Sequence, residues 1–534
     1  MIVPFFAVIV LLTYIVFGLN FTGYSGVDVL KPAKSETSID SMKTKSLSRR
    51  TFVRNVLLTS LAVPTLPLLS SGNTRLNGRL KVAVLGARSR GMGLAVLSID
   101  HPDTELGVIV EVDDEVAKSS LKKIEQRIGR GCKHVKDYRE VLDDKTIDIV
   151  AVATPNHSHA LTTLAAMQAG KDVFLEKPAS HTFLEGRWML DAARKFNRIC
   201  QVGTQARSCD GVQEGIRLVQ DGGIGDVRLV HAVSYRKRNS IGPKGDFPIP
   251  SSVDFNLWNA CAPFSEPRLT RKFFHYDWHW QRLYGGGEMT NNGPHQMDVA
   301  RWGLQLGRHP QTILTYGTNI GFDEAGDTLR SGVTILDYGD KTVVFEIRNL
   351  ETPMPYPSSH CAAFYGTEGS LVQSSADMFC VLYDPEGKKI KEFQGEDFVG
   401  YGKFNQGEKH FDNFVKAVKS RRYEDLNTDI LDGHRSVGMC HLGNISWYLG
   451  ENNRVTVKEV DETLQKMPGH DDHRKRLQSF LDYLTGNGAS LSGECLSLGP
   501  VLTFEDKSER FVDNKEADIL LSREYRKEFP VGPV

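Results

Sequence analysis

The chain lacks the charge excess, the paired cysteines and the repeats that mark several classes of protein. Its 534 residues carry 65 lysines and arginines against 66 aspartates and glutamates, a net charge of −1, so no nucleic-acid partner is predicted. None of the 8 cysteines lies in a C-x-x-C pair, so we expect free thiols rather than a disulfide framework or a zinc knuckle. We see no internal repeat and no low-complexity tract. The remaining composition is typical of a soluble globular protein long enough for two domains with extensions.

The first 78 residues are predicted to be a leader rather than part of the fold. The order Ser48-Arg49-Arg50-Thr51-Phe52, followed by an apolar stretch over residues 56–69, resembles a twin-arginine export signal, which we place at residues 42–73. We therefore expect export to the periplasm by the twin-arginine machinery, which carries folded proteins. Residues 2–19 are a second apolar run, short for a spanning helix of about 20 residues. Either this run is a membrane anchor or the protein starts at Met42, which we favour because Met42 opens a complete signal.

Strands that alternate with helices follow the leader. Continuous apolar runs at residues 80–85, 105–112, 147–153, 172–175 and 199–202 predict buried parallel strands. Helical patterns at 91–99, 115–128, 159–169 and 184–196 separate them. This alternation predicts a doubly wound α/β domain, a Rossmann fold, over residues 79–203.

Beyond residue 203 the strands follow one another without regular helices. Runs at 227–236, 311–317, 331–336, 342–349 and 360–365 predict a largely antiparallel sheet, and helices are predicted at 211–221, 410–420 and 433–449. We therefore expect a second, α+β domain at 204–450. Residues 451–534 look polar and irregular, and we expect a wrap-around C-terminal extension.

The first strand runs into a glycine-containing turn that opens a helix. Gly86 and Gly91 suit the tight turn and the helix packing of a dinucleotide fingerprint, but Arg88 stands where its second glycine belongs. Glu111, about 20 residues further on, is placed to accept hydrogen bonds from ribose hydroxyls, which favours NAD over NADP. Arg88 and Arg90 could instead meet a 2′-phosphate, so NADP stays open.

Two further turns follow the strands predicted at residues 147–153 and 172–175. Thr154, Pro155, Asn156 and His159 follow one, and Glu176-Lys177-Pro178 follows the other. Ligands of doubly wound sheets bind at these carboxyl ends. We therefore interpret these side chains as cofactor-binding and Lys177 as a candidate catalytic lysine.

Together these motifs resemble the glucose–fructose oxidoreductase, inositol dehydrogenase and rhizopine catabolism family (Gfo/Idh/MocA), in particular an exported subgroup. The resemblance covers about residues 80–449 and includes Gln201-Val202-Gly203-Thr204-Gln205, the run from Gly285 to Asp298, and Gly366-Thr367-Glu368-Gly369-Ser370. It implies a tightly bound nicotinamide cofactor, which Gln205 helps to bind, and a carbohydrate substrate. It also implies a homo-oligomer, a dimer or tetramer, formed through the open face of the second domain's sheet.

The resemblance also implies roles for three side chains. Lys177 would contact the nicotinamide side and the substrate hydroxyl, and His295 would act as acid/base on the carbinol proton. Asn291 stands where the family often has an aspartate, and an amide cannot take a proton. This agrees with the chemistry, because a histidine with a pKa near 6.5 can accept a hydroxyl proton near neutrality and a cationic lysine stabilises a developing alkoxide.

An aromatic stretch precedes the triple glycine. Tyr276, Trp278 and Trp280 offer apolar faces with polar edges, as a pyranose ring requires. Together with Asn292 they are predicted to contact substrate, with core packing as the alternative. Three histidine pairs have metal-like spacing, namely 157/159, 275/279 and 470/473, but no set of carboxylates completes them, so no metal is predicted.

Three functions fit these residues. The first is an NAD(P)-dependent dehydrogenase that takes hydride from a sugar, sugar-alcohol or glycoside hydroxyl. The second is a glycoside-cleaving enzyme in which transient oxidation acidifies a neighbouring C–H and the NAD is recycled, which would suit an exported protein. The third is a non-catalytic sugar-binding protein on the same scaffold, against which the presence of Lys177 and His295 argues.

Overall fold

The computed structural model describes residues 78–263, 269–395 and 407–534. The predicted leader, with the apolar run at 2–19 and the export signal at 42–73, lies outside these ranges except for its last residue. None of the described helices has both the length and the apolar character needed to cross a membrane.

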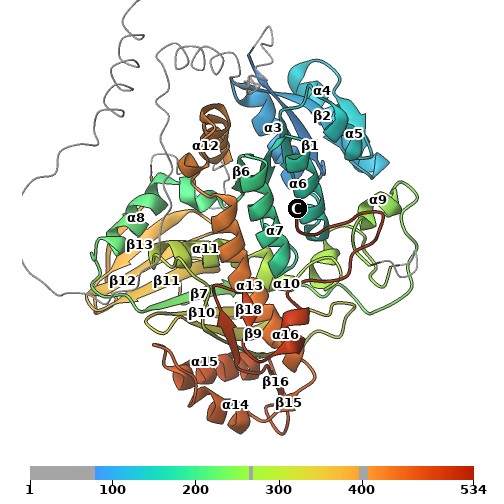
Figure 1. The fold of residues 1–534 in the computed structure, drawn as a ribbon. Coiled ribbons are helices and arrows are strands. Elements are labelled where there is room, and N and C mark those ends of the chain that lie inside the picture. Colours follow the sequence, from blue (N-terminus) through green and yellow to red (C-terminus); the bar gives the residue numbers. More distant parts are fainter. Residues whose placement is uncertain (1–77, 264–268, 396–406) are drawn as a thin grey trace, which may run out of the picture. The chain divides into compact units, whose positions relative to one another are not determined.

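The N-terminal domain is the predicted doubly wound sheet (Figure 1). Its six strands are all parallel, in the order β3-β2-β1-β4-β5-β6. They are β1 Leu80–Leu85, β2 Thr104–Val110, β3 Lys133–Val135, β4 Ile149–Val152, β5 Asp172–Leu175 and β6 Cys200–Val202. The helices are α3 Arg90–Asp100, α4 Asp114–Ile128, α5 Arg139–Asp143, α6 His159–Gln168 and α7 Phe183–Lys195. The strand order reverses between β1 and β4, which opens a crevice at their carboxyl ends.

The second domain is built on a mainly antiparallel sheet, as predicted. The sheet has 12 strands, and its order over most of its width is β14-β13-β12-β11-β7-β10-β9-β8-β16-β15. Among the strand pairs that the structure describes in this sheet, only β7 and β10 run parallel to each other. The strands are β7 Leu229–Tyr235, β8 Thr312–Thr318, β9 Ser331–Asp337, β10 Thr342–Arg348, β11 His360–Gly366, β12 Gly369–Ser374, β13 Phe379–Tyr383 and β14 Lys389–Phe393. The last three were not predicted as strands.

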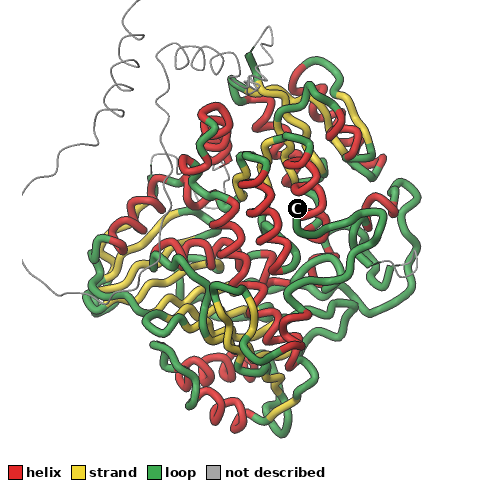
Figure 2. Tube along the Cα trace, viewed as in Figure 1, coloured by secondary structure: helices red, strands yellow, loops and turns green. Residues whose placement is uncertain are grey.

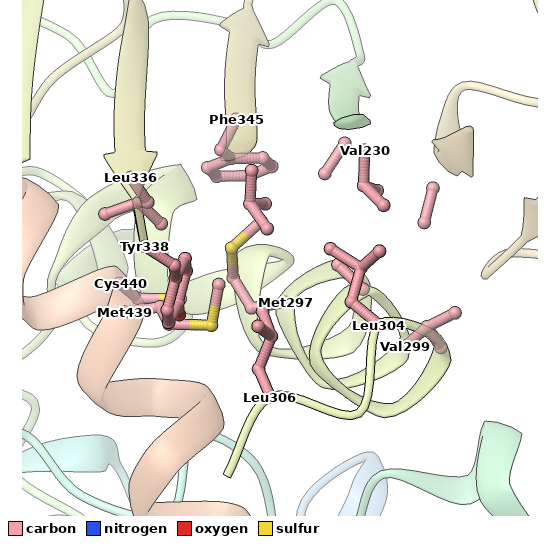
Figure 3. Packing of buried hydrophobic residues seen from close by; sticks show 14 of the residues in the cluster. Val230, Met297, Val299, Leu304, Leu306, Leu336, Tyr338, Phe345, Met439 and Cys440 are labelled. Carbon is pink, nitrogen blue, oxygen red and sulfur yellow. The ribbon is translucent and has the colours of Figure 1, made fainter. Parts of the chain in front are cut away.

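One face of this sheet packs on helices of the same domain. These are α8 Asp210–Gln220, α11 Gly293–Gly303 and α13 Ile430–Gly450. Figure 3 shows Met297 of α11 beneath Phe345 of β10, with Met439 and Cys440 of α13 beside Tyr338. Burial of this apolar surface stabilises the domain by roughly 25 cal/mol per Å².

The prediction of an irregular C-terminal extension is wrong. Residues 451–534 form α14 Val457–Leu464, α15 His473–Gly486, α16 Lys515–Ile519 and the strands β15 Arg454–Val455, β16 Leu496–Leu498, β17 Leu502–Glu505 and β18 Arg510–Phe511. Figure 2 shows these helices and strands in the lower part of the view. Leu477, Phe480, Leu481 and Leu484 repeat at helical spacing and form the apolar side of α15, so the signal was present among the charges.

Helix α15 covers the second face of the sheet. Phe480 stacks edge-on against Tyr316 of β8, in a cluster that also holds side chains of β9 and β10. The chain's own helix therefore occupies part of the face to which the resemblance assigned the oligomer contact. The oligomeric state stays a prediction, but this part of the face is not open.

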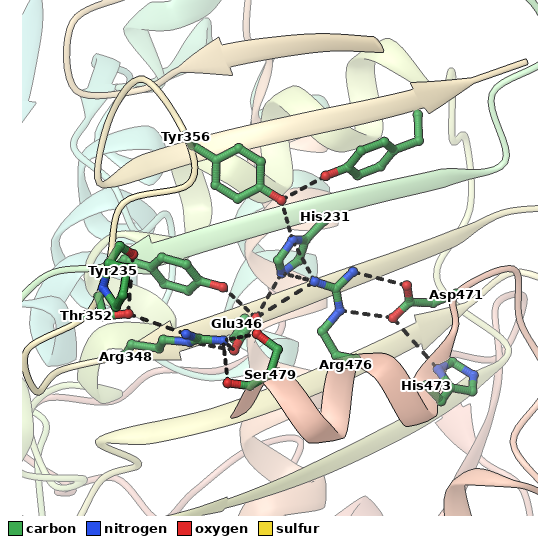
Figure 4. Close-up of polar contacts among 12 residues, drawn as sticks. His231, Tyr235, Glu346, Arg348, Thr352, Tyr356, Asp471, His473, Arg476 and Ser479 are labelled. Atoms are coloured by element: carbon green, nitrogen blue, oxygen red, sulfur yellow. Dashed lines mark hydrogen bonds and ion pairs between the residues drawn. The ribbon is translucent and has the colours of Figure 1, made fainter. Parts of the chain in front are cut away.

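A buried polar network joins α15 to the same face (Figure 4). Glu346 of β10 accepts hydrogen bonds from Tyr235 and Arg348 and contacts His231 at 3.0 Å, while Arg476 of α15 lies 4.0 Å away and pairs with Asp471. Burial alone would raise the pKa of Glu346, but these partners lower it to about 2. The carboxylate is thus charged and fully paired.

Two other segments return from late in the chain to the first domain. Helix α12 Gly407–Ser420 packs Phe411 and Phe414 against Phe174 of β5. The C-terminal residues Phe529 and Val531 pack beside α6, where Figure 1 marks the end of the chain. The two domains are therefore joined by more than one chain crossing.

Candidate active site

The turn after β1 requires both of its glycines. Gly86 has φ +81°, and a Cβ there would lie 2.7 Å from the carbonyl oxygen of Ala153; a Cβ on Gly91 would lie 1.7 Å from the oxygen of Gly86. The turn therefore passes close to β4 and opens α3 at Arg90, leaving Arg88 exposed. A helix N-terminus in this position suits a pyrophosphate.

Glu111 lies at the end of β2, with its carboxylate against the turn. One oxygen accepts from the Ala87 amide at 2.8 Å and the other from the Asp113 amide at 3.0 Å. Burial raises the pKa of Glu111 despite these hydrogen bonds. Each oxygen keeps a second lone pair that can accept from a ribose hydroxyl.

A cavity of about 400 Å³ runs across the carboxyl ends of the strands. It brings together most of the predicted cofactor residues: Gly86, Arg88, Arg90, Glu111, Thr154, Pro155, Asn156, His159, Glu176 and Lys177. Gly91 does not line it, consistent with a packing role, and Gln205 lines a second cavity instead. We call this space the cofactor cavity.

His159 ties two of the cavity-forming turns together. Its Nδ1 lies 2.7 Å from the carbonyl oxygen of Pro178 and its Nε2 lies 2.8 Å from that of Thr154. Burial lowers the pKa of this imidazole. Its role in the structure is to hold the turns after β4 and β5 in register.

Lys177 follows β5, and the peptide bond to Pro178 is cis. Its Nζ donates to the backbone carbonyl of Asn291 at 2.7 Å and lies 3.4 Å from the side-chain oxygen of the same residue. Burial lowers the pKa of Lys177. Asn291 ends the short helix α10 Gly287–Asn291, so the two domains meet at this ammonium group.

Beside Lys177 lies an ion pair that the sequence analysis missed. Glu288 of α10 is fully buried and accepts from the Arg238 guanidinium at 3.0 and 3.1 Å, from Ser234, and from the side chain of Asn292. Burial would raise the pKa of Glu288, but Arg238 lowers it. Glu288 was visible within the glycine-rich run, but its partner lies 50 residues away in the sequence.

A second cavity of about 650 Å³ adjoins the first, and we call it the distal cavity. The two share Arg90, Glu176, Lys177, Arg236 and Asn292. His295 lines the distal cavity, and burial together with the charge of Lys177 holds its pKa well below 6.5. A neutral imidazole and a lysine ammonium thus lie along one continuous space.

The aromatic residues divide between the cavity wall and the core. Tyr276, 46% exposed, and Trp278 line the cofactor cavity. Trp280 lines neither cavity, because its ring is buried against Ile241 and Ala325 with the Arg330 guanidinium 4.8 Å away. For Trp280 the core-packing alternative therefore describes its position.

Arg523, from the C-terminal region, ties together the outer wall of the cofactor cavity. Its guanidinium donates to the carbonyl of His157 at 2.7 Å and to that of Leu283 at 3.2 Å, and it lies 3.5 Å from both Cys261 Sγ and Glu185. The segments that hold His157 and Cys261 line the cavity through Asn156, Ser158 and Ala260. Nothing in the sequence pointed to this arginine.

The histidine pairs with metal-like spacing do not converge. Among the described residues, the one group of three potential ligands is His309, His434 and Glu509. Both oxygens of Glu509 already accept from Arg187, and His434 lies 3.0 Å from one of them. In the structure Glu509 forms an ion pair with Arg187 of α7 and a hydrogen bond with His434 of α13, and these contacts fix the β17–β18 turn against the two helices.

Comparison with known proteins identifies the family. Residues 80–204 match the family described as an oxidoreductase family with an NAD-binding Rossmann fold, Gfo/Idh/MocA. The scyllo-inositol 2-dehydrogenase (NADP(+)) of Bacillus subtilis is 30% identical over 292 residues, which cover 48% of this chain and 75% of the relative. The chain belongs to the Gfo/Idh/MocA family.

Other Gfo/Idh/MocA relatives match over shorter stretches. The levoglucosan dehydrogenase of Pseudarthrobacter phenanthrenivorans is 28% identical over 197 residues, 36% of this chain and 41% of the relative. The inositol 2-dehydrogenase of Salmonella typhimurium is 29% identical over 150 residues, 27% of this chain and 44% of the relative. The chain thus spans less than half the length of these two relatives.

A solved structure shares the two-domain fold of the Gfo/Idh/MocA chain. This is levoglucosan dehydrogenase in complex with NADH and levoglucosan, which aligns with a TM-score of 0.50 at 20% identity, over 68% of this chain and 95% of that one. At this identity the match shows the fold, and the cofactor class follows from the family.

Proposed function

We propose that the protein is an NAD(P)-dependent oxidoreductase that transfers hydride from a carbohydrate CH–OH group to a nicotinamide. The observation that carries the proposal is the position of Lys177. Its ammonium lies where the cofactor cavity and the distal cavity meet, and the distal cavity is also lined by His295. One charged donor and one neutral base are the groups that alcohol oxidation requires.

The residues of the cofactor cavity fit a dinucleotide. The turn at Gly86 has no room for a side chain, and two buried polar atoms at the cavity, Arg90 Nη2 and Asn156 Oδ1, have no hydrogen-bond partner among the described residues. Glu111 would hold the adenosine ribose, and this carboxylate favours NAD over NADP. The bound nicotinamide supplies the hydride acceptor.

The chain's own side chains handle the proton and the developing charge. His295 is neutral near pH 7 and can therefore receive the carbinol proton, although burial and the charge of Lys177 lower its pKa and make it a weaker base than a free imidazole. Lys177 stabilises the alkoxide character that develops as hydride leaves. Asn291 cannot take the proton; it orients Lys177 through two oxygens instead.

Replacing Lys177 tests this function. We expect Lys177→Met to lower turnover by about 10²–10⁴-fold, because the alkoxide loses its charged donor. Lys122→Met on the exposed side of α4 is the matched control and should behave as wild type. The cofactor that copurifies with the protein is first identified by mass spectrometry. Its reduction is then followed at the nicotinamide absorbance as each sugar of a panel is added.

The other outcomes of this experiment separate the competing functions. Glycoside cleavage without net reduction, lost in Lys177→Met, would support transient oxidation with recycled NAD in place of net dehydrogenation. Sugar binding with no nicotinamide bound or bindable would contradict both enzymatic functions and support a binding protein.

We also propose export to the periplasm by the twin-arginine route, supported by Arg49 and Arg50 ahead of the apolar stretch. A reporter fused to residues 1–78 should lose export when both arginines become lysine. Export that survives the double substitution would contradict the assignment, and membrane retention that depends on residues 2–19 would indicate an anchor instead.

A further inference from the structure

We propose that the distal cavity binds a second glycosyl unit, so that the substrate is a disaccharide or larger glycoside rather than a free monosaccharide. The inference rests on the proposed function, which puts the oxidised ring at Lys177. It assigns the space beyond that lysine to the sugar linked to this ring. His360 and Gln296 would hold the linked sugar.

The size of the distal cavity is the first argument. Its volume of about 650 Å³ is no smaller than that of the cofactor cavity, which we assign to the dinucleotide. It falls within the range of about 300–1,000 Å³ typical of small-molecule sites. A single sugar ring at Lys177 would leave most of this volume unfilled.

Two buried polar atoms at the distal cavity are the second argument. Gln296 on α11 is 1% exposed and His360 at the start of β11 is 7% exposed. Among the described residues, Gln296 Oε1 and His360 Nε2 have no hydrogen-bond partner. A buried polar atom left unpaired costs about 1–3 kcal/mol, so a ligand that pairs with both would be bound by them.

The chemistry of these atoms favours hydroxyl groups. Gln296 Oε1 can only accept a hydrogen bond. The other ring nitrogen of His360 lies 2.8 Å from the Ser359 hydroxyl, so His360 Nε2 donates or accepts according to tautomer. A sugar hydroxyl can satisfy either role.

The charges around the cavity point to a neutral ligand. Arg90, Lys177 and Arg236 contribute positive charge to its lining, whereas Glu176, Asp377 and Glu408 contribute negative charge. Arg90 and Glu176 are paired at 2.5 Å. A lining of mixed sign gives no net attraction for an anion, but it offers donors and acceptors to a polyhydroxylated ligand.

The test compares one reacting ring alone and in a disaccharide. For the wild type we expect kcat/KM to be at least about tenfold higher for a disaccharide than for its component monosaccharide, since a tenfold change corresponds to 1.4 kcal/mol. His360→Ala should lower kcat/KM for the disaccharide by about tenfold, mainly by raising KM. It should change the monosaccharide value by less than about twofold. His470→Ala, an exposed histidine outside both cavities, is the matched control.

Equilibrium titration of the cofactor-loaded protein provides a readout independent of turnover. Disaccharide binding that His360→Ala weakens and His470→Ala preserves supports the inference. Gln296→Leu gives a second variant should His360→Ala fail to fold. The inference would be overturned if the wild type had equal kcat/KM for the two sugars. It would also be overturned if His360→Ala lowered kcat/KM equally for both.

Failure of the proposed function gives a different pattern. If no sugar reduces the cofactor or is cleaved, the oxidoreductase assignment fails while the titration still decides the inference. If monosaccharides turn over and no disaccharide binds, only the inference fails.

Discussion

A single asparagine provides both hydrogen-bond contacts of the Lys177 ammonium group. Asn291 contributes two neutral oxygens to the ammonium group, where the family often has an aspartate at this position. Burial lowers the pKa of Lys177 even though Glu176 and Glu288 raise it, and Asn291 adds no carboxylate to offset the desolvation further. The protonated form that stabilises an alkoxide is therefore lost at a lower pH than in an exposed lysine.

Asn291→Asp should reverse this effect. A carboxylate about 3.4 Å from Nζ favours the charged lysine and raises its pKa, so the basic limb of the kcat/KM pH profile should move to higher pH. Asn291→Ala adds no charge and should not move the limb upward. A basic limb that stays in place in Asn291→Asp would mean that Lys177 does not set it.

For single residues, the sequence predicted which side chains belong to the site better than it predicted which side chains they contact. Lys177, Asn291 and Glu111 stand in recognisable local patterns, and the structure brings them to one crevice. The pairing of Glu288 with Arg238, the position of Trp280 outside both cavities and the contacts of Arg523 all depend on tertiary packing. No local pattern encodes these contacts.

Among the elements, the segment that carries Arg523 connects the C-terminal region to the cofactor cavity. One guanidinium joins the turn at His157, the Cys261 segment and the Leu283 segment. A side chain without donors at this position takes the Leu283 carbonyl's guanidinium donor away, leaves the His157 carbonyl with only the Cys261 thiol, and leaves Glu185 without a cationic partner. The Leu283 segment would then lose its link to the other two segments.

Arg523→Met should therefore weaken cofactor binding with little change in the chemical step. We expect the cofactor Kd to rise by about tenfold or more, corresponding to the loss of about 1.4 kcal/mol or more of stabilisation of the wall. Arg474→Met, which removes an exposed ion pair on α15, is the control. Titration of cofactor into stripped protein measures the effect; an unchanged Kd would show that the wall holds without this arginine.

The sequence predicted the helices and strands well where their apolar pattern is clear. The strands β1, β4 and β5 and the helices α4, α7 and α13 lie close to the predicted ranges. The short β3 and the edge strand β14, whose residues are mostly exposed, carry too few apolar residues to stand out. In α15 the apolar stripe was hidden among charged residues, and its place on the sheet followed only from the structure.

Across the whole molecule, neutral histidines are a recurrent feature of the interior. Burial lowers the pKa to about 4 for His410 and His434, and to about 3 for His157 and His441. In the unfolded chain these groups titrate near 6.5. As the pH falls below 6.5 the unfolded state binds more protons than the folded state, so the free energy of unfolding falls.

We therefore expect acid destabilisation that begins well above the range of the carboxylates. Each such histidine would lower the free energy of unfolding by up to about 2 kcal/mol between pH 6.5 and pH 5. Above pH 7 the free energy of unfolding would not depend on these histidines. Chemical denaturation at pH 7.5, 6.0 and 5.0 measures this dependence. His441→Gln should flatten it and the exposed His470→Gln should not; a free energy of unfolding that is constant over this range would contradict the prediction.

The contacts of Arg523 also bear on how the protein is made. Residues 523–534 emerge from the ribosome after the glycine turn, the Lys177 turn and the aromatic segment, yet they fasten the segments that form the cavity wall. The cofactor cavity therefore reaches its final form only after nearly all of this sequence has been synthesised. For a protein proposed to leave the cytoplasm folded, stable cofactor binding before export would then require that this C-terminal segment has been synthesised. Chains that end before Arg523 would hold their cofactor poorly.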